Sequence, residues 1–274
     1  MKIFQSLIAL ASITFFYSCA PKPYAATNKI YKQKVAVFAK TLRAPPAVTI
    51  AADSLKVPSH WVGTTNFGMR KPNMVIIHHT AQNSCEQTLQ TFITDKTQVS
   101  AHYVICKDGT LHHMLNDYLR AWQAGVAMWG SNTDINSSSV GIEIDNNGVE
   151  NFTEAQLNTL LGLLATLKKN YNIPAANFIG HADIAPVRKN DPNVTFPWKR
   201  LADNGYGLWY ADTTGVIIPG DFNISYALKI IGYDIFNLNA ATVAFRRHFL
   251  SVENAGEFTE TEKKVLYMLM KKYL

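Results

Sequence analysis

The sequence predicts an α/β fold followed by a small helical module, and three observations support this prediction. Residues 74–80 begin with a continuous apolar run rich in β-branched side chains, which is typical of a strand buried on both faces of a sheet. Two capping-box signatures, at Ser84 and Thr153, each begin an amphipathic helical pattern. After about residue 204, three short helical patterns follow. Strands that alternate with helices indicate the α/β class.

The remaining elements are indicated by their own patterns. Residues 101–106 and 110–114 predict a hairpin around a Lys-Asp-Gly turn. Residues 140–145 alternate apolar and acidic side chains toward their end and predict a third strand. Apolar residues at helical spacing predict the three C-terminal helices, within residues 224–231, 241–250 and 259–273.

Size and charge limit the classes of partner. The chain has 274 residues, enough for one large domain or for a main domain with an appendage. Its net charge is +6 at pH 7 and its isoelectric point is near 9.1. However, the basic residues are spread thinly and form no stripe with interleaved aromatic residues. We therefore expect no nucleic-acid binding and favour an anionic polymer such as a bacterial wall or envelope glycan.

The N-terminus predicts export and lipid attachment. A basic start at Lys2 precedes an apolar run over residues 3–16, which has the length of a signal peptide and is short for a membrane span. Ser18 followed by Cys19 resembles a bacterial lipoprotein cleavage site, although the two aromatic residues before Ser18 depart from the usual pattern. We expect residues 1–18 to be a lipoprotein signal peptide and Cys19 to be the acylated N-terminus. An ordinary secretory signal that is cleaved nearby is the alternative.

The segment after Cys19 predicts a linker. Residues 20–46 contain several Pro, Ala and Lys residues without sustained periodicity, so we expect residues 19–50 to be a lipidated N-terminus and tether. A short apolar stretch, residues 47–51, is a candidate for the first ordered element. Cys85 and Cys106 are the other cysteines. They either pair in an oxidising compartment or remain two separate buried thiols.

Polar side chains at unusual places in the strands are the first candidates for chemistry. His78 and His79 end the first predicted strand, and alternation places them on opposite faces, so at most one of them faces a given site. A pair of core or rim histidines is the alternative. Glu143 interrupts an apolar strand, where an unpaired carboxylate costs several kcal/mol. Glu143 is therefore a candidate general base or metal ligand.

The segment 181–192 is the second source of candidates. His181, Lys189 and Asp191 lie in a stretch that its two prolines keep from forming a regular helix. A surface loop with a solvated charge run is the alternative. Two imidazoles and a carboxylate around a tetrahedral zinc, with a fourth position for water, would make a hydrolytic metal site. The spacing of these residues matches no short metal-binding motif.

Trp122 and His102 are each candidates for binding or for packing. Trp122 lies in a segment rich in Trp, Gly and Asn, which has the composition of a long irregular loop. Such loops are often functional, and contact with carbohydrate or peptide is one role for Trp122, with core packing an equal alternative. His102 shares a strand face with Val104 and Cys106, which favours a satisfied core histidine over a ligand.

Taken together, these residues resemble a known family. The similarity covers residues 73–201, and the motif at residues 180–192 is highly specific. The C-terminal segments 227–233 and 244–249 are similar to the peptidoglycan-binding helical domain of lipoprotein members of the same family. The stretches IHHTA (77–81), SAHYVI (100–105), VGIEI (140–144) and GHADIAPVRKNDP (180–192) resemble the zinc-dependent N-acetylmuramoyl-L-alanine amidases of the amidase-2 type.

The resemblance implies a fold and a role for each matching residue. It implies a mixed central β-sheet flanked by helices, with a small C-terminal three-helix domain. Zn²⁺, one ion per chain, is expected on His78, His181 and Asp191. Glu143 matches the catalytic glutamate of the family, and Lys189 matches the lysine that stabilises the transition state.

Two positions depart from the usual motif, and three others are candidate substrate contacts. Val187 stands where the family usually has glycine, and Asn190 replaces a frequent threonine. Neither position is a ligand. We predict Trp122, His102 and Arg188 as candidate substrate-binding residues.

The resemblance also implies domains, a substrate and a location. We expect a zinc amidase domain over residues 51–203 and a peptidoglycan-binding-like helical domain over residues 204–274. The expected reaction is hydrolysis of the amide between N-acetylmuramic acid, or its anhydro form, and the L-alanine of the stem peptide. A non-catalytic peptidoglycan receptor and a zinc peptidase acting on stem peptides are the alternatives. The expected protein is a monomer, lipid-anchored at the periplasmic face of the outer membrane, with muropeptides and the membrane as partners.

Overall fold

The structure, a computed structural model, describes residues 23–43 and 64–274. The chain divides into two compact units, Met1–Asn66 and Phe67–Leu274. The predicted signal peptide, its Cys19 and the apolar stretch at residues 47–51 lie outside the described residues. No helix among those described is long and apolar enough to cross a membrane.

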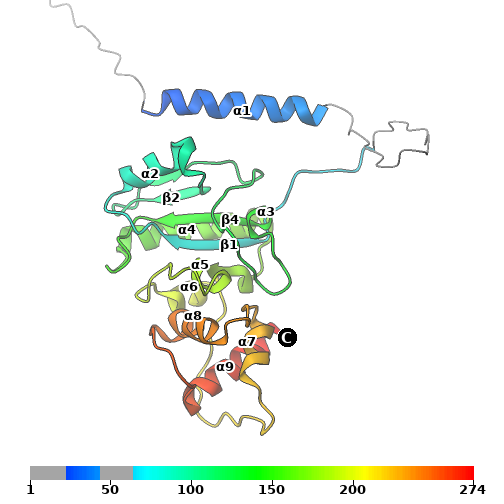
Figure 1. Ribbon diagram of the computed structural model, residues 1–274, viewed down its shortest axis with the longest axis vertical. Helices are drawn as coiled ribbons and strands as arrows, with labels where there is room; N and C mark the ends of the chain where they lie inside the picture. The colour runs from blue at the N-terminus through cyan, green and yellow to red at the C-terminus, as the bar shows by residue number, and fades with distance from the viewer. Residues whose placement is uncertain (1–22, 44–63) are drawn as a thin grey trace, which may run out of the picture. The chain divides into compact units, whose positions relative to one another are not determined.

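The first unit contains a helix where the sequence predicts a tether without periodicity. Helix α1 spans Ala25–Arg43, coloured blue in Figure 1. Alanine and lysine are good helix formers, and Lys40 and Arg43 in the last turn favour its C-terminal end. None of its side chains is buried. These residues are therefore helical, and the tether over residues 19–50 stays a prediction.

The second unit is built on a five-stranded sheet with the order β3-β2-β4-β1-β5. Strand β1 pairs in parallel with β4 and β5, and β2 pairs in parallel with β4, whereas β3 is antiparallel to β2. The predicted mixed sheet is thus confirmed, with the hairpin at one edge (Figure 1). The strands are β1 (Met74–His79), β2 (Tyr103–Ile105), β3 (Leu111–His113), β4 (Ser139–Ile144) and β5 (Phe178–Gly180).

The helices begin where the sequence places capping residues. Thr153 and Thr259 each form a complete capping box with the residue three positions later, and Ser84 accepts a hydrogen bond from the Gln87 N–H. Helix α8 begins three residues before its predicted start because Asn237 caps it. The helices are α2 (Cys85–Ile93), α3 (Ile135–Ser138), α4 (Glu154–Tyr171), α5 (His181–Ile184), α6 (Trp198–Asp203), α7 (Ile224–Ile231), α8 (Leu238–Leu250) and α9 (Glu260–Tyr273), with short 3-10 turns at Asp95–Thr97 and Ala175–Asn177.

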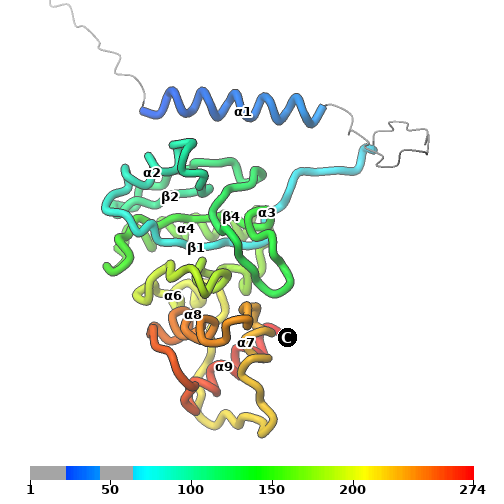
Figure 2. Tube along the Cα trace, viewed as in Figure 1, coloured from blue at the N-terminus to red at the C-terminus, as the bar shows by residue number. Residues whose placement is uncertain are grey.

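The sheet packs a separate apolar core on each face. On one face, Val75 and Ile77 of β1 pack against the leucines of α4. On the other, Ile76 belongs to one continuous core with Phe245 of α8 and Leu266 of α9. The C-terminal helices therefore share a core with the sheet, and the boundary predicted between residues 203 and 204 does not separate two hydrophobic cores. Figure 2 follows the chain from α6 into these helices.

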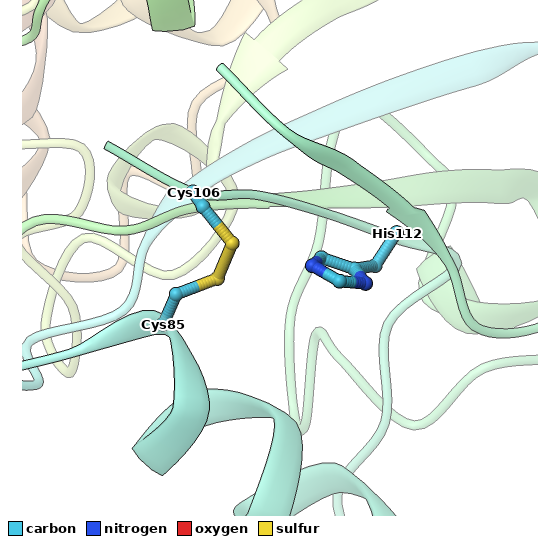
Figure 3. A group of neighbouring side chains, drawn as sticks. All are labelled: Cys85, Cys106 and His112. Carbon is cyan, nitrogen blue, oxygen red and sulfur yellow. A yellow bond between two sulfur atoms is a disulfide. The ribbon is translucent and has the colours of Figure 1, made fainter. Parts of the chain in front are cut away.

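A disulfide ties the start of α2 to the end of β2. Cys85 and Cys106 are bonded, with their Cα atoms 5.3 Å apart, so the paired alternative holds. A loop of 21 residues closed in this way stabilises a fold by roughly 3 kcal/mol through the unfolded chain. His112 lies beside the bridge, as Figure 3 shows. Because both sulfurs are bonded to each other, this cluster offers no thiolate ligand to a metal.

Candidate metal and catalytic site

Three ligand atoms from two distant parts of the chain meet at one point. His78 lies at the end of β1, His181 is the first residue of α5, and Asp191 lies in the loop after α5. Nδ1 of His78 is 2.9 Å from Nδ1 of His181 and 2.9 Å from Oδ2 of Asp191. Nδ1 of His181 is 3.0 Å from the same carboxylate oxygen. All three side chains are buried.

The partners of the other ring nitrogens decide where the imidazole protons lie. Nε2 of His78 is 2.5 Å from Oε1 of Gln123, and Nε2 of His181 is 3.1 Å from the carbonyl oxygen of Ala124. Both partners are acceptors, so each Nε2 carries the hydrogen and donates it. Each Nδ1 then presents a lone pair. Two lone pairs and a carboxylate oxygen that converge in this way could hold a cation.

The donor set and its spacing fit a zinc ion. Two imidazole nitrogens and one carboxylate oxygen are typical of catalytic zinc sites, which leave a fourth position open. Ligands at about 2.0 Å from a tetrahedral metal are roughly 3.3 Å apart, and the separations of 2.9–3.0 Å here are slightly shorter. Metal-bound histidines commonly donate their other ring N–H to an acceptor that fixes the ring orientation, and the acceptors behind His78 and His181 are of this kind.

Glu143 lies beside this cluster because of strand register. It pairs with His78 across β4 and β1, so both side chains project from the same face of the sheet. Its Oε1 is 4.0 Å from Nδ1 of His78, its side chain is 13% exposed, and its Oε2 has no hydrogen-bond partner within the described part of the chain. Burial raises the pKa of Glu143 to about 7, opposed by the charge of His78 and reinforced by that of Asp191. A carboxyl group with such a pKa can both accept and release a proton near neutral pH.

Lys189 lies on the ligand loop, two residues before Asp191. Its backbone N–H donates to the carbonyl oxygen of Ala185, which continues the turn after α5. Its positive charge lowers the pKa of Glu143, which places its side chain within electrostatic reach of that carboxyl group. Within the described ranges, its ammonium group forms no ion pair.

Gln123 is a residue of the site that sequence reasoning missed. Its amide nitrogen donates to the hydroxyl of Ser139, which leaves its carbonyl oxygen for His78. A Cβ atom at Gly141 would lie 2.7 Å from the Cγ of Gln123, so glycine is required beneath this side chain. The signal in the sequence was the glycine at 141 in the middle of an apolar strand, which marks a close approach of another group.

The three predicted substrate contacts differ in their surroundings. Trp122 is 47% exposed, so the core-packing alternative is wrong and the ring is accessible. Arg188 donates to the carbonyl oxygens of Ala124 and Val126, which braces the loop behind His181. His102 is fully buried, and its ring accepts from the Gly141 N–H and approaches the Leu119 carbonyl and Arg70. His102 is thus a core histidine rather than a substrate contact, because its ring is enclosed by protein partners.

The second histidine of the pair faces away from the metal cluster. Nδ1 of His79 accepts a hydrogen bond of 2.9 Å from the Asn193 N–H. Asn193 in turn donates to the side chain of Asn146 and the backbone of Glu150. The prediction that alternation separates His78 from His79 is confirmed. His79 holds the chain that follows Asp191.

Comparisons with known sequences match this site to a family. Residues 68–194 match the family model Amidase_2, described as N-acetylmuramoyl-L-alanine amidase. The chain is 30% identical over 231 residues to N-acetylmuramoyl-L-alanine amidase AmiD of Escherichia coli strain K12, which covers 73% of this chain and 83% of that protein. It is 38% identical over 103 residues to 1,6-anhydro-N-acetylmuramyl-L-alanine amidase AmpD of Enterobacter cloacae, which covers 38% of this chain and 55% of that protein.

Solved structures extend the similarity to the C-terminal helices. A complex of Escherichia coli AmiD with anhydro-N-acetylmuramic acid-L-Ala-D-gamma-Glu-L-Lys has a TM-score of 0.67 at 25% identity, over 82% of this chain and 97% of that one. AmpDh3 of Pseudomonas aeruginosa has a TM-score of 0.65 at 27% identity, over 83% of this chain and 99% of that one. The fold and the site are those of an amide hydrolase. The chain belongs to the N-acetylmuramoyl-L-alanine amidase family, of the amidase-2 type.

Proposed function

We propose that this amidase uses one zinc ion, held by His78, His181 and Asp191, to cleave the amide between N-acetylmuramic acid, or its anhydro form, and L-alanine. The observation that carries the proposal is the convergence of two Nδ1 lone pairs and a carboxylate oxygen beside Glu143. The similarity to structures that contain an anhydromuramyl tripeptide or pentapeptide supports the substrate class.

The chemistry divides between the ion and the side chains around it. A bound zinc ion would supply Lewis acidity to the amide carbonyl and lower the pKa of a water molecule. Glu143 accepts a proton from the attacking water as its oxygen bonds to the carbonyl carbon. It then delivers that proton to the alanine nitrogen as the carbon–nitrogen bond breaks. The immediate products are a carboxylic acid on the lactyl group and a free L-alanine amine, and the acid then passes its proton to the amine or to water, which leaves a carboxylate.

Lys189 has a separate role in this proposal. Negative charge develops on the carbonyl oxygen when water adds to the amide. A positive group held beside the reacting atoms stabilises that charge more strongly than it stabilises the neutral substrate. Two observations support this role: the charge of Lys189 lowers the pKa of Glu143, and its ammonium group forms no ion pair within the described residues. Trp122, which is exposed next to Gln123, is proposed as a substrate contact.

Product analysis distinguishes the three activities that the sequence left in competition. Purified muropeptides are digested with the protein and analysed by mass spectrometry, with the isosteric variant Glu143→Gln as the control. Intact stem peptides with a free L-alanine amine are the expected products. Shortened stems would support a zinc peptidase instead. Unchanged muropeptides would support a non-catalytic receptor.

We extend the proposal to the location of the enzyme. Its substrate is a cell-wall polymer, so export to the envelope fits the activity, and lipidation at Cys19 would hold the enzyme near the wall at the periplasmic face of the outer membrane. Mass spectrometry of the N-terminal peptide tests acylation, and membrane fractionation of the parent against Cys19→Ser tests anchoring. An unacylated parent in the soluble fraction would support the ordinary secretory signal.

A further inference from the structure

Asp183 is a buried carboxylate in the ligand segment that the proposed reaction does not use. It lies on α5, two residues after His181, and is 2% exposed. Its Oδ2 accepts hydrogen bonds of 2.7 Å from the Gly180 N–H and from Nδ1 of His248. Its Oδ1 accepts one of 2.7 Å from the hydroxyl of Tyr233. Three donors thus satisfy a charge that would be costly to bury alone.

Two of these three donors belong to the C-terminal helices. Tyr233 directly follows the glycine that caps α7, and His248 lies in α8. The imidazole of His248 stacks on the indole of Trp198, with ring centroids 3.9 Å apart, and on Phe249 at 4.1 Å. Both donors are themselves buried. Packing of their own rings therefore fixes both donors in position beside the carboxylate of Asp183.

The same helices also support the loop behind the metal ligands. The Gly232 carbonyl accepts a hydrogen bond of 2.8 Å from the Gly130 N–H, and Trp129 packs edge-on against the ring of Tyr233. A few residues earlier, the Met128 N–H donates to the carbonyl oxygen of Ile184 in α5. The loop that supplies an acceptor to Nε2 of His181 is thus anchored on the C-terminal helices.

We propose that Asp183, Tyr233 and His248 are positioning residues through which the C-terminal helices hold the ligand segment in its metal-binding geometry. This inference rests on the proposed zinc function. The two ligands of the segment are joined directly, because the Ala182 N–H donates to the carbonyl oxygen of Asp191 over 2.7 Å. A shift of the short helix α5 therefore moves His181 and the Asp191 loop together. The C-terminal helices thus support the metal ligands through α5.

Zinc affinity tests this role apart from turnover. The full chain is titrated with zinc against a chelator of known affinity, and the unfolding temperature of the metal-free protein is measured alongside. Tyr233→Phe and His248→Phe keep an aromatic ring and remove the donor, so both are expected to weaken zinc binding about 10- to 100-fold. His248→Asn places an amide donor near the position of Nδ1 and is expected to recover most of that loss.

A matched control separates positioning from stability. Glu262 pairs with the buried Arg246 in the same helical module and does not touch Asp183. Glu262→Gln is expected to lower the unfolding temperature and leave zinc affinity unchanged. Parent-like zinc affinity in both phenylalanine variants would overturn the inference, as would an equal loss in Glu262→Gln. A parent chain that binds no zinc would overturn the proposed function, and this inference with it.

A second inference rests on α1 and is independent of the metal site. This helix carries an apolar stripe at Tyr31, Val35, Phe38 and Leu42, which recur at helical spacing on one side. Phe38 is 54% exposed and Leu42 is 80% exposed. The helix has no acidic residue, and its basic residues are Lys29, Lys32, Lys34, Lys40 and Arg43.

The charges lie where they would flank the stripe on a flat surface. At 100° per residue, Lys32 and Lys34 project on opposite sides of the arc centred on the four apolar residues. Lysines in such places bury their stems along an apolar surface and extend their ammonium groups to its polar boundary. An exposed apolar stripe flanked by cations, without an acid, complements an anionic lipid bilayer.

We propose that α1 lies in the interface of an anionic membrane. Residues 19–274 carrying Cys19→Ser, so that no lipid is attached, are sedimented with vesicles of phosphatidylcholine with or without phosphatidylglycerol. Binding is expected only with phosphatidylglycerol and is expected to weaken as salt rises. Phe38→Asp should reduce it at least tenfold, and Gln33→Asp, the same charge outside the stripe, much less. Equal binding of the parent to both kinds of vesicle would overturn the proposal. So would a Phe38→Asp variant that loses binding to purified cell-wall sacculi but keeps its binding to vesicles.

Discussion

The two halves of the metal site are held by different kinds of structure. His78 and Glu143 project from paired strands whose register is fixed by a backbone hydrogen-bond ladder. His181 and Asp191 lie in a short helix and a loop, where the Ala124 carbonyl accepts from the ring of His181 and residues of the C-terminal module donate to Asp183 of the same helix. The strand half is therefore held by backbone pairing between strands, whereas the loop half is held by side-chain and loop contacts. Substitutions should separate the two halves.

The largest effect is expected from removing the proton carrier on the strand half. Glu143→Gln keeps the shape of the side chain and removes its ability to take a proton from water. Turnover of a muropeptide should fall by about 10²- to 10⁴-fold, measured by chromatography of the released stem peptide. Zinc affinity should change little, because Glu143 is not a ligand. Turnover above a tenth of the parent value would contradict the role given to Glu143.

The loop half should be the more sensitive one to loss of a ligand charge. Asp191→Asn keeps the size of the side chain but removes the negative charge between two imidazoles. Zinc binding should weaken by at least about 100-fold, because a carboxylate ligand is replaced by a neutral oxygen. In the parent chain, a chelator should abolish activity and added zinc should restore it. Full activity in the chelated enzyme would mean that the reaction does not need a metal ion.

A smaller effect is expected at Gly141, which lies beneath the side chain of Gln123. Gly141→Ala would place a Cβ atom 2.7 Å from the Cγ of Gln123 and push its amide away from His78. Without that acceptor the imidazole loses its fixed tautomer, so zinc affinity should fall about tenfold, as titration would measure. Gly162→Ala is the matched control, because open space surrounds that position in α4. It should leave zinc binding intact and stabilise the fold by about 0.5–1 kcal/mol.

The smallest effect concerns the pH dependence of stability. Burial lowers the pKa of His102 to about 4 from its usual 6.5. Between these two pKa values, the unfolded chain binds a proton at His102 that the folded chain does not bind. The contribution of His102 to stability is therefore present above pH 6.5 and is lost as pH falls toward 4. Its full size is at most about 3 kcal/mol. Urea unfolding at pH 7 and pH 4.5 should show a smaller loss in His102→Gln than in the parent. An equal loss would mean that His102 is not responsible.

The strand half of the site was within reach of the sequence. Alternation in β1 separated His78 from His79, and the carboxylate inside an apolar strand singled out Glu143. The capping boxes at Thr153 and Thr259 marked helix starts because a cap is a local interaction between residues three positions apart. The residues of segment 181–192 made His181 and Asp191 candidate metal ligands. The mixed sheet, the assignment of these two residues to zinc and the role of Lys189 came from the resemblance to a family.

The remaining features depend on contacts between residues far apart in the chain. No local pattern connects Gln123 with His78, or Asp183 with Tyr233 and His248, because these pairs are joined only by packing. The shared core between β1 and α8 had the same origin, since amphipathic helices look alike whether they pack on one another or on a sheet. The helix α1 was not predicted, because Ile30 and Val37 lie outside its apolar stripe and blur the helical periodicity.

The central claim is that Nδ1 of His78, Nδ1 of His181 and a carboxylate oxygen of Asp191 hold one zinc ion. Anomalous diffraction at the zinc absorption edge, from crystals of the full chain grown with zinc, tests it most directly. The account predicts one strong peak within bonding distance of these three atoms, with the Nε2 atoms still directed at Gln123 and Ala124. A peak bound by the Nε2 atoms, a peak at other residues, or no peak would contradict it.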